Sequence, residues 1–170
     1  MAQIRKFGKP TTLRLSIIKN QATELLWNGK VETTLVRAKS VKAYAEKLLT
    51  LAVRTYEDNV TVVKEVYNDK GAKVKKEVKN DGPKKLAARR KLMAKLNDVQ
   101  EQRAYKEKRS DFRAKTKDIQ HPLIEKIFNV YAPKYAKREQ ELKQGGGYTR
   151  IIRKDIRRGD NAEIVVLELV

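Results

Sequence analysis

Residues 146–170 read GGYTRIIRKDIRRGDNAEIVVLELV, and this stretch decides the fold. β-Branched and apolar residues lie on both sides of Gly159-Asp160-Asn161, which is a typical turn sequence. The pattern predicts a β-hairpin with strands at 148–156 and 162–170. The second strand is rich in Ile, Val and Leu, so we expect it to be the most deeply buried strand of the protein.

The exposed side of this hairpin carries basic residues. Alternation along the first strand turns Ile151 inward and allows Ile156 to follow it. The basic side chains then gather near an exposed turn, where guanidinium groups are suited to bidentate contacts with phosphates. These residues are Arg150, Arg153, Lys154, Arg157 and Arg158.

The amino-terminal third predicts two helices joined by a short strand. Thr11 or Thr12 is a suitable N-cap for the first helix, which ends at Asn28-Gly29. Residues 30–34 are β-prone, and a long amphipathic helix follows from about 35 to 54. The apolar residues at helical spacing are Leu15, Ile18, Ala22, Leu25, Leu26, Ala38, Val41, Ala45, Leu48, Leu49 and Ala52.

The middle of the chain is highly charged. Period-two alternation over residues 56–82, with a turn at 68–71, predicts a charged β-hairpin. A helix is expected at 84–96. Residues 98–120 are expected to extend that helix as a solvated segment with few core residues.

Another helix is predicted to start at Pro122 and to dock on the core. Its apolar stripe consists of Leu123, Ile124, Ile127, Phe128 and Val130. Pro133 is expected to break or kink it, and residues 139–147 read as a linker. Trp27 and Phe128 are predicted to lie in the core or at its rim.

The formal net charge of +19 is far larger than a chain of 170 residues needs for solubility. A polyanion is the natural neutraliser of this charge, because Lys and Arg spread along the chain displace counterions from a phosphate backbone at many points. Nucleic acid is therefore the expected partner.

A membrane partner, a secreted location and a second domain are not expected. No apolar run approaches the roughly 20 residues of a membrane span, and the first residues lack the apolar core of a signal peptide. The absence of cysteine excludes disulfides and thiolate metal sites and fits the cytosol. An apolar fraction of 40% is enough for one modest core, so residues 1–170 are predicted to form a single domain.

Several blocks of the chain resemble the bacterial large-subunit ribosomal protein seventeen family. They occur in order at both ends of the chain. The blocks are RKFGKPT at 5–11, LLWNGKVETT at 25–34 with Arg37-Ala38-Lys39, EKLLTLA at 46–52, and GGYTRI through RRGDNA to LELV at 146–170.

The resemblance implies an α+β fold, a two-layer sandwich of helices packed on a small mixed β-sheet. It also implies a structural protein of the large ribosomal subunit in the cytoplasm, which binds large-subunit (23S) rRNA, contacts neighbouring large-subunit proteins and supports assembly and translation. Leu15 stands where family members tend to have a basic residue. The segments 56–82 and 98–120 look like insertions relative to shorter members.

Residues 1–10 are predicted to be a basic arm that becomes ordered on the polyanion it meets, because no acidic residue precedes Glu24. The arm and the first helix contribute Arg5, Lys6, Lys9, Arg14 and Lys19 to the predicted RNA-binding set. Arg37 and Lys39 join this set from a block that resembles the family. Tyr148 has two interpretations, stacking on an unpaired base or packing in the core, and core packing is favoured.

No catalytic residue, metal site, cofactor or small-molecule substrate is predicted. His121 is the only histidine and has no cysteine or carboxylate cluster near it in sequence. Asp155, Asp160 and Glu163 are the candidate Mg²⁺ ligands of a nuclease, but they lie among arginines and no phosphate-cradling loop is present. A DNA-architectural protein and, less favoured, an RNA-processing nuclease are the alternatives to a ribosomal protein.

Overall fold

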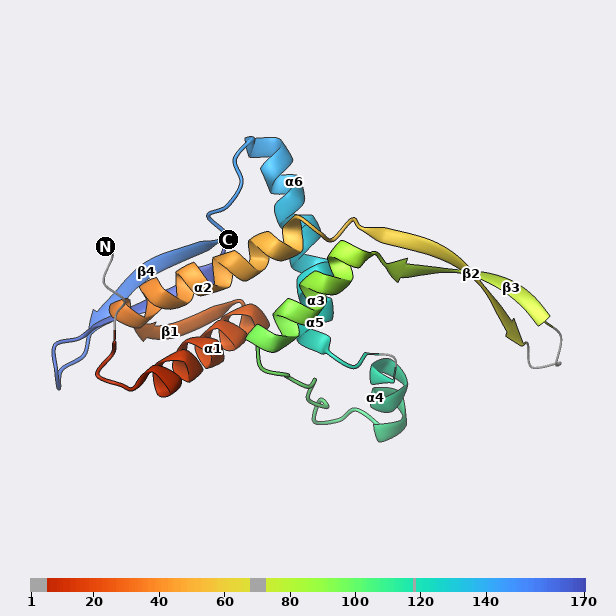
Figure 1. Ribbon diagram of the computed structural model, residues 1–170. Helices are drawn as coiled ribbons and strands as arrows, with labels where there is room; N and C mark the ends of the chain where they lie inside the picture. The colour runs from red at the N-terminus through yellow and green to blue at the C-terminus, as the bar shows by residue number, and fades with distance from the viewer. Residues whose placement is uncertain (1–5, 68–72, 118) are drawn as a thin grey trace.

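The computed structural model describes residues 6–67, 73–117 and 119–170. Helices and short antiparallel sheets make it an α+β protein, as predicted (Figure 1). The elements are α1 (Thr11–Asn28), β1 (Lys30–Thr34), α2 (Leu35–Val53), β2 (Asn59–Tyr67), β3 (Lys73–Asp81), α3 (Pro83–Lys95), α4 (Arg109–Thr116), α5 (Pro122–Lys126), η1 (Ile127–Tyr131), α6 (Ala132–Leu142), β4 (Thr149–Ile156) and β5 (Glu163–Leu169).

The main sheet has the order β1-β5-β4 and is antiparallel throughout rather than mixed. β5 lies in the centre, so Leu167 is opposite Val31 on one side and Ile151 on the other. This central position explains why β5 is the most apolar strand. The carboxy-terminal hairpin is therefore confirmed, and β1 is the third strand of its sheet.

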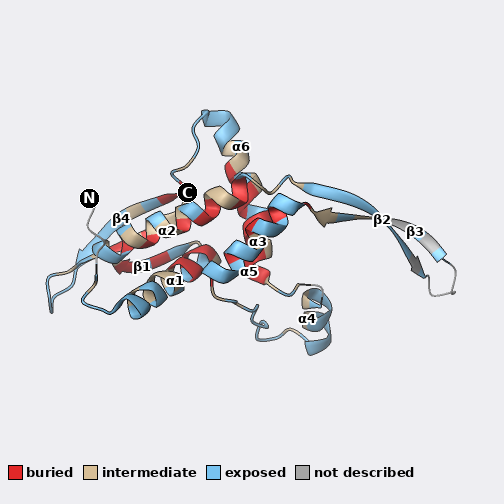
Figure 2. Cartoon of the chain, in the orientation of Figure 1, coloured by how far each residue is buried: buried red, intermediate tan, exposed pale blue. Residues whose placement is uncertain are grey.

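Helices α1 and α2 cover one face of this sheet. Val165 and Leu167 of β5 are fully buried beneath them, and Leu25 and Leu26 of α1 are fully buried as well. Figure 2 shows buried residues along α1, β1 and α2. At the edge strand, the Thr149 hydroxyl donates a hydrogen bond of 2.8 Å to the Glu46 carboxylate of α2. Burial of these apolar side chains against the sheet is the main stabilising contribution to the fold.

The connection between α1 and β1 depends on Gly29. This residue has a φ of 80°, and its N–H donates to the carbonyl of Leu25 at 2.8 Å, which closes the helix. The predicted threonine N-cap is wrong, because α1 begins at Thr11 itself, with Pro10 before it and no side-chain cap. The first turns of α1 extend beyond the core, so Leu15 is exposed rather than part of the apolar stripe.

Pro133 does not break the helix that starts at Pro122. The π-helical turn η1 lies just before it, and the N–H of Ala132 donates to the carbonyl of Ile127, five residues back. This wider turn makes room for a ring that would collide with the preceding turn of a regular helix. The helical stretch consequently continues to Leu142 and includes part of the predicted linker 139–147.

The strands β2 and β3 form a separate two-stranded ribbon that projects from the helices (Figure 1). The predicted hairpin over 56–82 is confirmed in its strands, whereas its predicted turn at 68–71 lies outside the described residues. The base of the ribbon is tied to α3 by Lys85, whose ammonium contacts Asp81 at 2.9 Å and the Asn59 side chain at 2.7 Å. Arg89 adds an ion pair to Asp81.

The charged segment after α3 is mostly not helical. Residues 98–108 contain turns but no helix or strand, and α4 covers only Arg109–Thr116. No residue of α4 is buried. A helix without an apolar stripe gains little from packing, which explains why the predicted extension of α3 does not form.

Asp58 is expected to stabilise α3 by capping its first turn. Its carboxylate accepts hydrogen bonds from the N–H groups of Lys84 and Lys85 at 2.8 and 3.3 Å, where the first turn of the helix has no other side-chain cap. Asp58→Ala should lower the free energy of unfolding by about 0.5 to 2 kcal/mol. Asp58→Asn keeps an acceptor and should retain most of that stability, as urea denaturation would measure. Equal losses in both variants would show that capping is not the cause.

Candidate nucleic-acid interface

One end of the molecule brings together most of the predicted basic residues. The described part of the amino-terminal arm, the first turns of α1 and α2, and the β4–β5 turn all lie at this end (Figure 1). Lys6 and Lys9 are exposed there, and Arg37 and Lys39 project from the first turns of α2. Arg14 and Lys19 of α1 are half-buried, and Arg5 lies outside the described residues.

The two helix N-termini add positive potential to this end. Neither α1 nor α2 has an acidic residue in its first turn, and neither has a side-chain N-cap. The aligned peptide dipoles leave partial positive charge on the first N–H groups, which favours nearby anions. The end of the molecule thus combines side-chain and backbone groups of the same sign.

The β4–β5 turn holds its two arginines differently. Arg157 is bound within the turn, since its guanidinium donates to both oxygens of Asp160 at 2.9 and 2.6 Å. These hydrogen bonds lower the pKa of Asp160 to about 2. Arg158 is exposed and makes no hydrogen bond or ion pair with a residue that the structure describes. Arg158 is therefore the arginine of the turn that is available to a ligand.

The other basic residues of β4 lie on different faces of the sheet. Lys154 sits at a β-bulge and forms an ion pair of 2.7 Å with Glu32 on the face away from the helices. Arg150 shares that open face, whereas Arg153, opposite Val165, lies on the helix side at the exposed edge. The register also turns Ile156 to the helix side, but it lies past the end of the core and stays half exposed.

Helix α3 is a basic surface that the sequence analysis did not identify. Its thirteen residues contain no acidic side chain, which is the signal that would have identified it. Lys85 and Arg89 face the ribbon and are paired with Asp81. The exposed cations of α3 are Lys84, Arg90, Lys91 and Lys95.

The α3 surface adjoins the outer face of α2. The Tyr44 hydroxyl of α2 donates a hydrogen bond of 2.7 Å to the carbonyl of Lys95, which fixes the end of α3 against α2. Lys47 and Arg54 continue the exposed basic face along α2. A long ligand that follows α2 from its first turn therefore reaches α3.

Tyr148 packs in the core, and the base-stacking interpretation is excluded for the folded chain. Only 3% of its surface is exposed, and its ring centroid lies 4.7 Å from that of Tyr135. The Tyr135 hydroxyl donates to the Tyr148 carbonyl at 3.4 Å, and burial raises the pKa of Tyr135 to about 12. A tilted ring pair of this kind stabilises the contact between α6 and β4.

The described residues offer no metal centre. Among them there is no group of three or more His, Cys, Asp or Glu side chains placed to hold an ion. Two of the three candidate Mg²⁺ ligands are engaged locally, because Asp160 binds Arg157 and Asp155 accepts the N–H of Ile156 at 2.7 Å. The His121 ring lies 3.2 Å from the Asp98 carboxylate. In the described part of the chain, no helix is both long and apolar enough to cross a bilayer.

The ion pair between Arg157 and Asp160 in the β4–β5 turn can be tested by titration of Asp160. Arg157→Ala should raise the pKa of Asp160 from about 2 toward the ordinary value of about 4, as NMR of its carboxyl carbon would report. Because the folded pKa is depressed, the stabilisation is present above about pH 4 and disappears as the pH falls through about 2. Arg158→Ala should leave this pKa unchanged, and an equal effect of both substitutions would contradict the pairing.

A strongly basic α+β protein with cations on exposed helices has the features of the class of nucleic-acid-binding proteins. Comparison with known families agrees. Residues 17–170 match the family described as ribosomal protein L17, and the chain belongs to that family of structural ribosomal proteins.

Curated relatives match along the whole chain. Each of the following is a protein named large ribosomal subunit protein bL17. The relative from Lachnospira eligens is 39% identical over 192 aligned positions that cover both chains fully. The relative from Acetivibrio thermocellus is 36% identical over 190 positions that cover 98% of each chain. The relative from Clostridium tetani is 32% identical over 170 positions that cover both chains fully.

Proposed function

We propose that the protein is a structural component of the large ribosomal subunit in the cytoplasm, where it binds 23S rRNA and supports subunit assembly. The observation that carries the proposal is the end of the molecule where the arm, the first turns of α1 and α2, and the β4–β5 turn meet. These cations come from segments far apart in sequence and have few acidic neighbours to neutralise them. Family membership and the names of the relatives support the same assignment.

The rRNA contacts are proposed to follow two connected surfaces. The first is that end of the molecule, with Lys6, Lys9, Arg37, Lys39, Arg153 and Arg158 as its exposed cations. The second is the outer face of α2 and α3. Arg150 and Lys154, on the open face of the sheet, are assigned a smaller share, since Lys154 is already paired with Glu32.

The extended parts of the chain have proposed roles as well. The arm at 1–10 is proposed to follow rRNA beyond the folded domain. The segments 56–82 and 98–120 are proposed to be attachments that reach other components of the subunit, including neighbouring large-subunit proteins. A projecting ribbon with a tied base holds its orientation, which suits contact with a partner at a fixed position.

The test is binding to large-subunit rRNA fragments at several salt concentrations. Each neutralised phosphate should contribute a slope of about 0.7 to 0.9 in log affinity against log salt, so several contacts give a steep total slope. The protein should also co-sediment with large subunits through a high-salt wash. A slope near zero, or equal affinity for duplex DNA of the same length, would contradict the proposal.

A further inference from the structure

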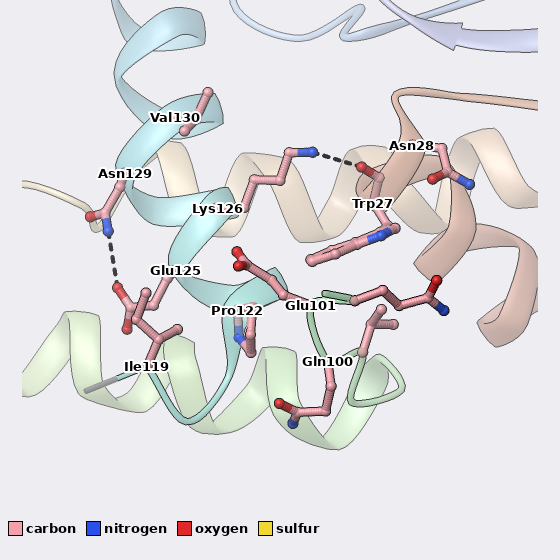
Figure 3. A pocket seen from close by; sticks show the side chains of 12 residues that line it. Trp27, Asn28, Gln100, Glu101, Ile119, Pro122, Glu125, Lys126, Asn129 and Val130 are labelled. Carbon is pink, nitrogen blue, oxygen red and sulfur yellow. Dashed lines mark hydrogen bonds between the residues drawn. The ribbon is translucent and has the colours of Figure 1, made fainter. Parts of the chain in front are cut away.

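A hollow of about 900 Å³ opens on the surface of the molecule. It is bounded by Trp27 and Asn28 at the end of α1, by the helical stretch from Pro122 to Val130, and by residues 99–102 of the loop after α3. Figure 3 shows the Trp27 ring and the Glu101 side chain pointing into it. A hollow of this size accommodates a short stretch of another chain.

The charged groups in the wall of this hollow are already engaged, with one exception. Lys126 donates a hydrogen bond of 2.6 Å to the Trp27 carbonyl, and its ammonium lies 5.4 Å from the centre of the Trp27 ring. Glu125 accepts hydrogen bonds from Arg89 at 3.2 Å and from Asn129 at 3.0 Å. Glu101 is exposed and makes no hydrogen bond or ion pair with a residue that the structure describes. Its charge acts at longer range on Lys115, whose ammonium is itself paired with Glu107.

This wall is unsuited to rRNA. A phosphate entering it would meet the Glu101 carboxylate, and Lys126, the cation among the described residues of the wall, already donates a hydrogen bond to the Trp27 carbonyl. The ammonium of Lys126 also occupies a face of the only indole ring that could stack on a base. The exposed charge in the hollow is thus opposite in sign to that of the basic surfaces, in a protein whose net charge is +19.

We propose that this hollow docks a segment of a neighbouring ribosomal protein that carries a basic residue next to apolar ones. The inference rests on the proposed function, which supplies the ribosomal setting. Glu101 pairs with the Lys or Arg of that segment, and the apolar residues pack on the rim formed by Trp27 and Val130, of which Val130 is 54% exposed. The neutral amides of Asn28 and Gln102 supply hydrogen bonds to a peptide backbone.

A photo-reactive benzoylphenylalanine in place of Val130 tests the occupant in purified large subunits. The expected product survives ribonuclease, is destroyed by protease, and maps to a segment of another protein with Lys or Arg beside apolar residues. The same group in place of Arg153, on the proposed RNA side, should give a product that ribonuclease removes. An RNA product at position 130, an acidic protein segment there, or no product at 130 while position 153 reacts would overturn the inference.

Charge reversal at Glu101 supplies the second arm of the test. Glu101→Lys should lower the protein cross-link at position 130 by about tenfold, because a basic segment would then meet a like charge. Glu141→Lys makes the same change in net charge on an exposed part of α6 and should leave the yield unchanged. Equal yields in the two variants would overturn the charge pairing. If neither variant nor the parent enters the subunit, it is the proposed function that fails.

Discussion

Leu167→Ala should lower the free energy of unfolding by about 2 to 5 kcal/mol, which is enough to unfold a domain of ordinary stability. Leu167 has no exposed surface and lies in the central strand, opposite Val31 and Ile151. Truncation removes buried methyl groups and leaves a cavity. The strands paired on both sides of β5 restrict the movement that would close this cavity. Urea denaturation followed by circular dichroism measures the loss.

Val166→Ala is the matched control for this substitution. Val166 is the next residue of β5 and points to the open face of the sheet, where it is only partly buried. Its truncation should therefore cost much less. A loss at Val166 as large as that at Leu167 would mean that both faces of the sheet are covered in solution, contrary to the single helical layer of the structure.

Neutralising four exposed cations at the basic end should reduce the slope of log rRNA affinity against log salt by about 3. The substitutions are Arg37→Gln, Lys39→Gln, Arg153→Gln and Arg158→Gln. None of these side chains has an ion pair with a residue that the structure describes, so the thermal midpoint should change little. Filter binding over a series of salt concentrations gives the slope, and calorimetry gives the midpoint.

A control variant removes the same net charge elsewhere. Lys106, Lys108, Lys137 and Lys143 are exposed in the loop after α3 and on or just after α6. Their replacement by Gln should reduce the slope by less than the change at the basic end. If both variants weaken binding equally, affinity follows net charge alone and the basic end is not a defined interface.

The strands and main helices were predictable because their signals are local. Period-two alternation identified the carboxy-terminal hairpin, and Asn28-Gly29 marked the end of α1 at a residue with positive φ. The central position of β5 also follows from its composition, since a strand paired on both sides and buried under helices needs apolar residues. Its pairing with β1 depends on a contact between distant segments, which no local pattern contains.

The failures share a physical cause, which is that tertiary context decides between local alternatives. Pro133 was expected to interrupt a helix, but a π-helical turn before it removes the steric conflict. Residues 98–108 have helix-forming composition, yet without an apolar stripe they gain nothing from packing. Ile156 lies on the helix side of the sheet, but it is exposed because it lies beyond the end of the core.

The sequence predicted which basic residues belong to the RNA-binding set. It did not predict which of them are free to bind a ligand. Arg157 and Arg158 are neighbours in sequence, and only the structure separates the one held by Asp160 from the one that is exposed. The α3 surface could be identified only from the ion pairs, because Asp81 and Glu125 pair with Lys85 and Arg89, whereas the outer cations of α3 have no partner among the described residues. Which cations are available to a ligand thus depends on the ion pairs that the tertiary structure forms.

The position of β5 also affects the order of events during synthesis. β5 follows every other element along the chain, yet both β1 and β4 pair with it. In a nascent chain, the apolar sides of α1, β1 and α2 therefore lack their partner strand. That strand is present only after residues 163–169 have been made. Closing a contact such as Lys30 with Glu168 over most of the chain is slow. Newly made copies consequently present an incomplete core to chaperones and proteases until β5 has emerged.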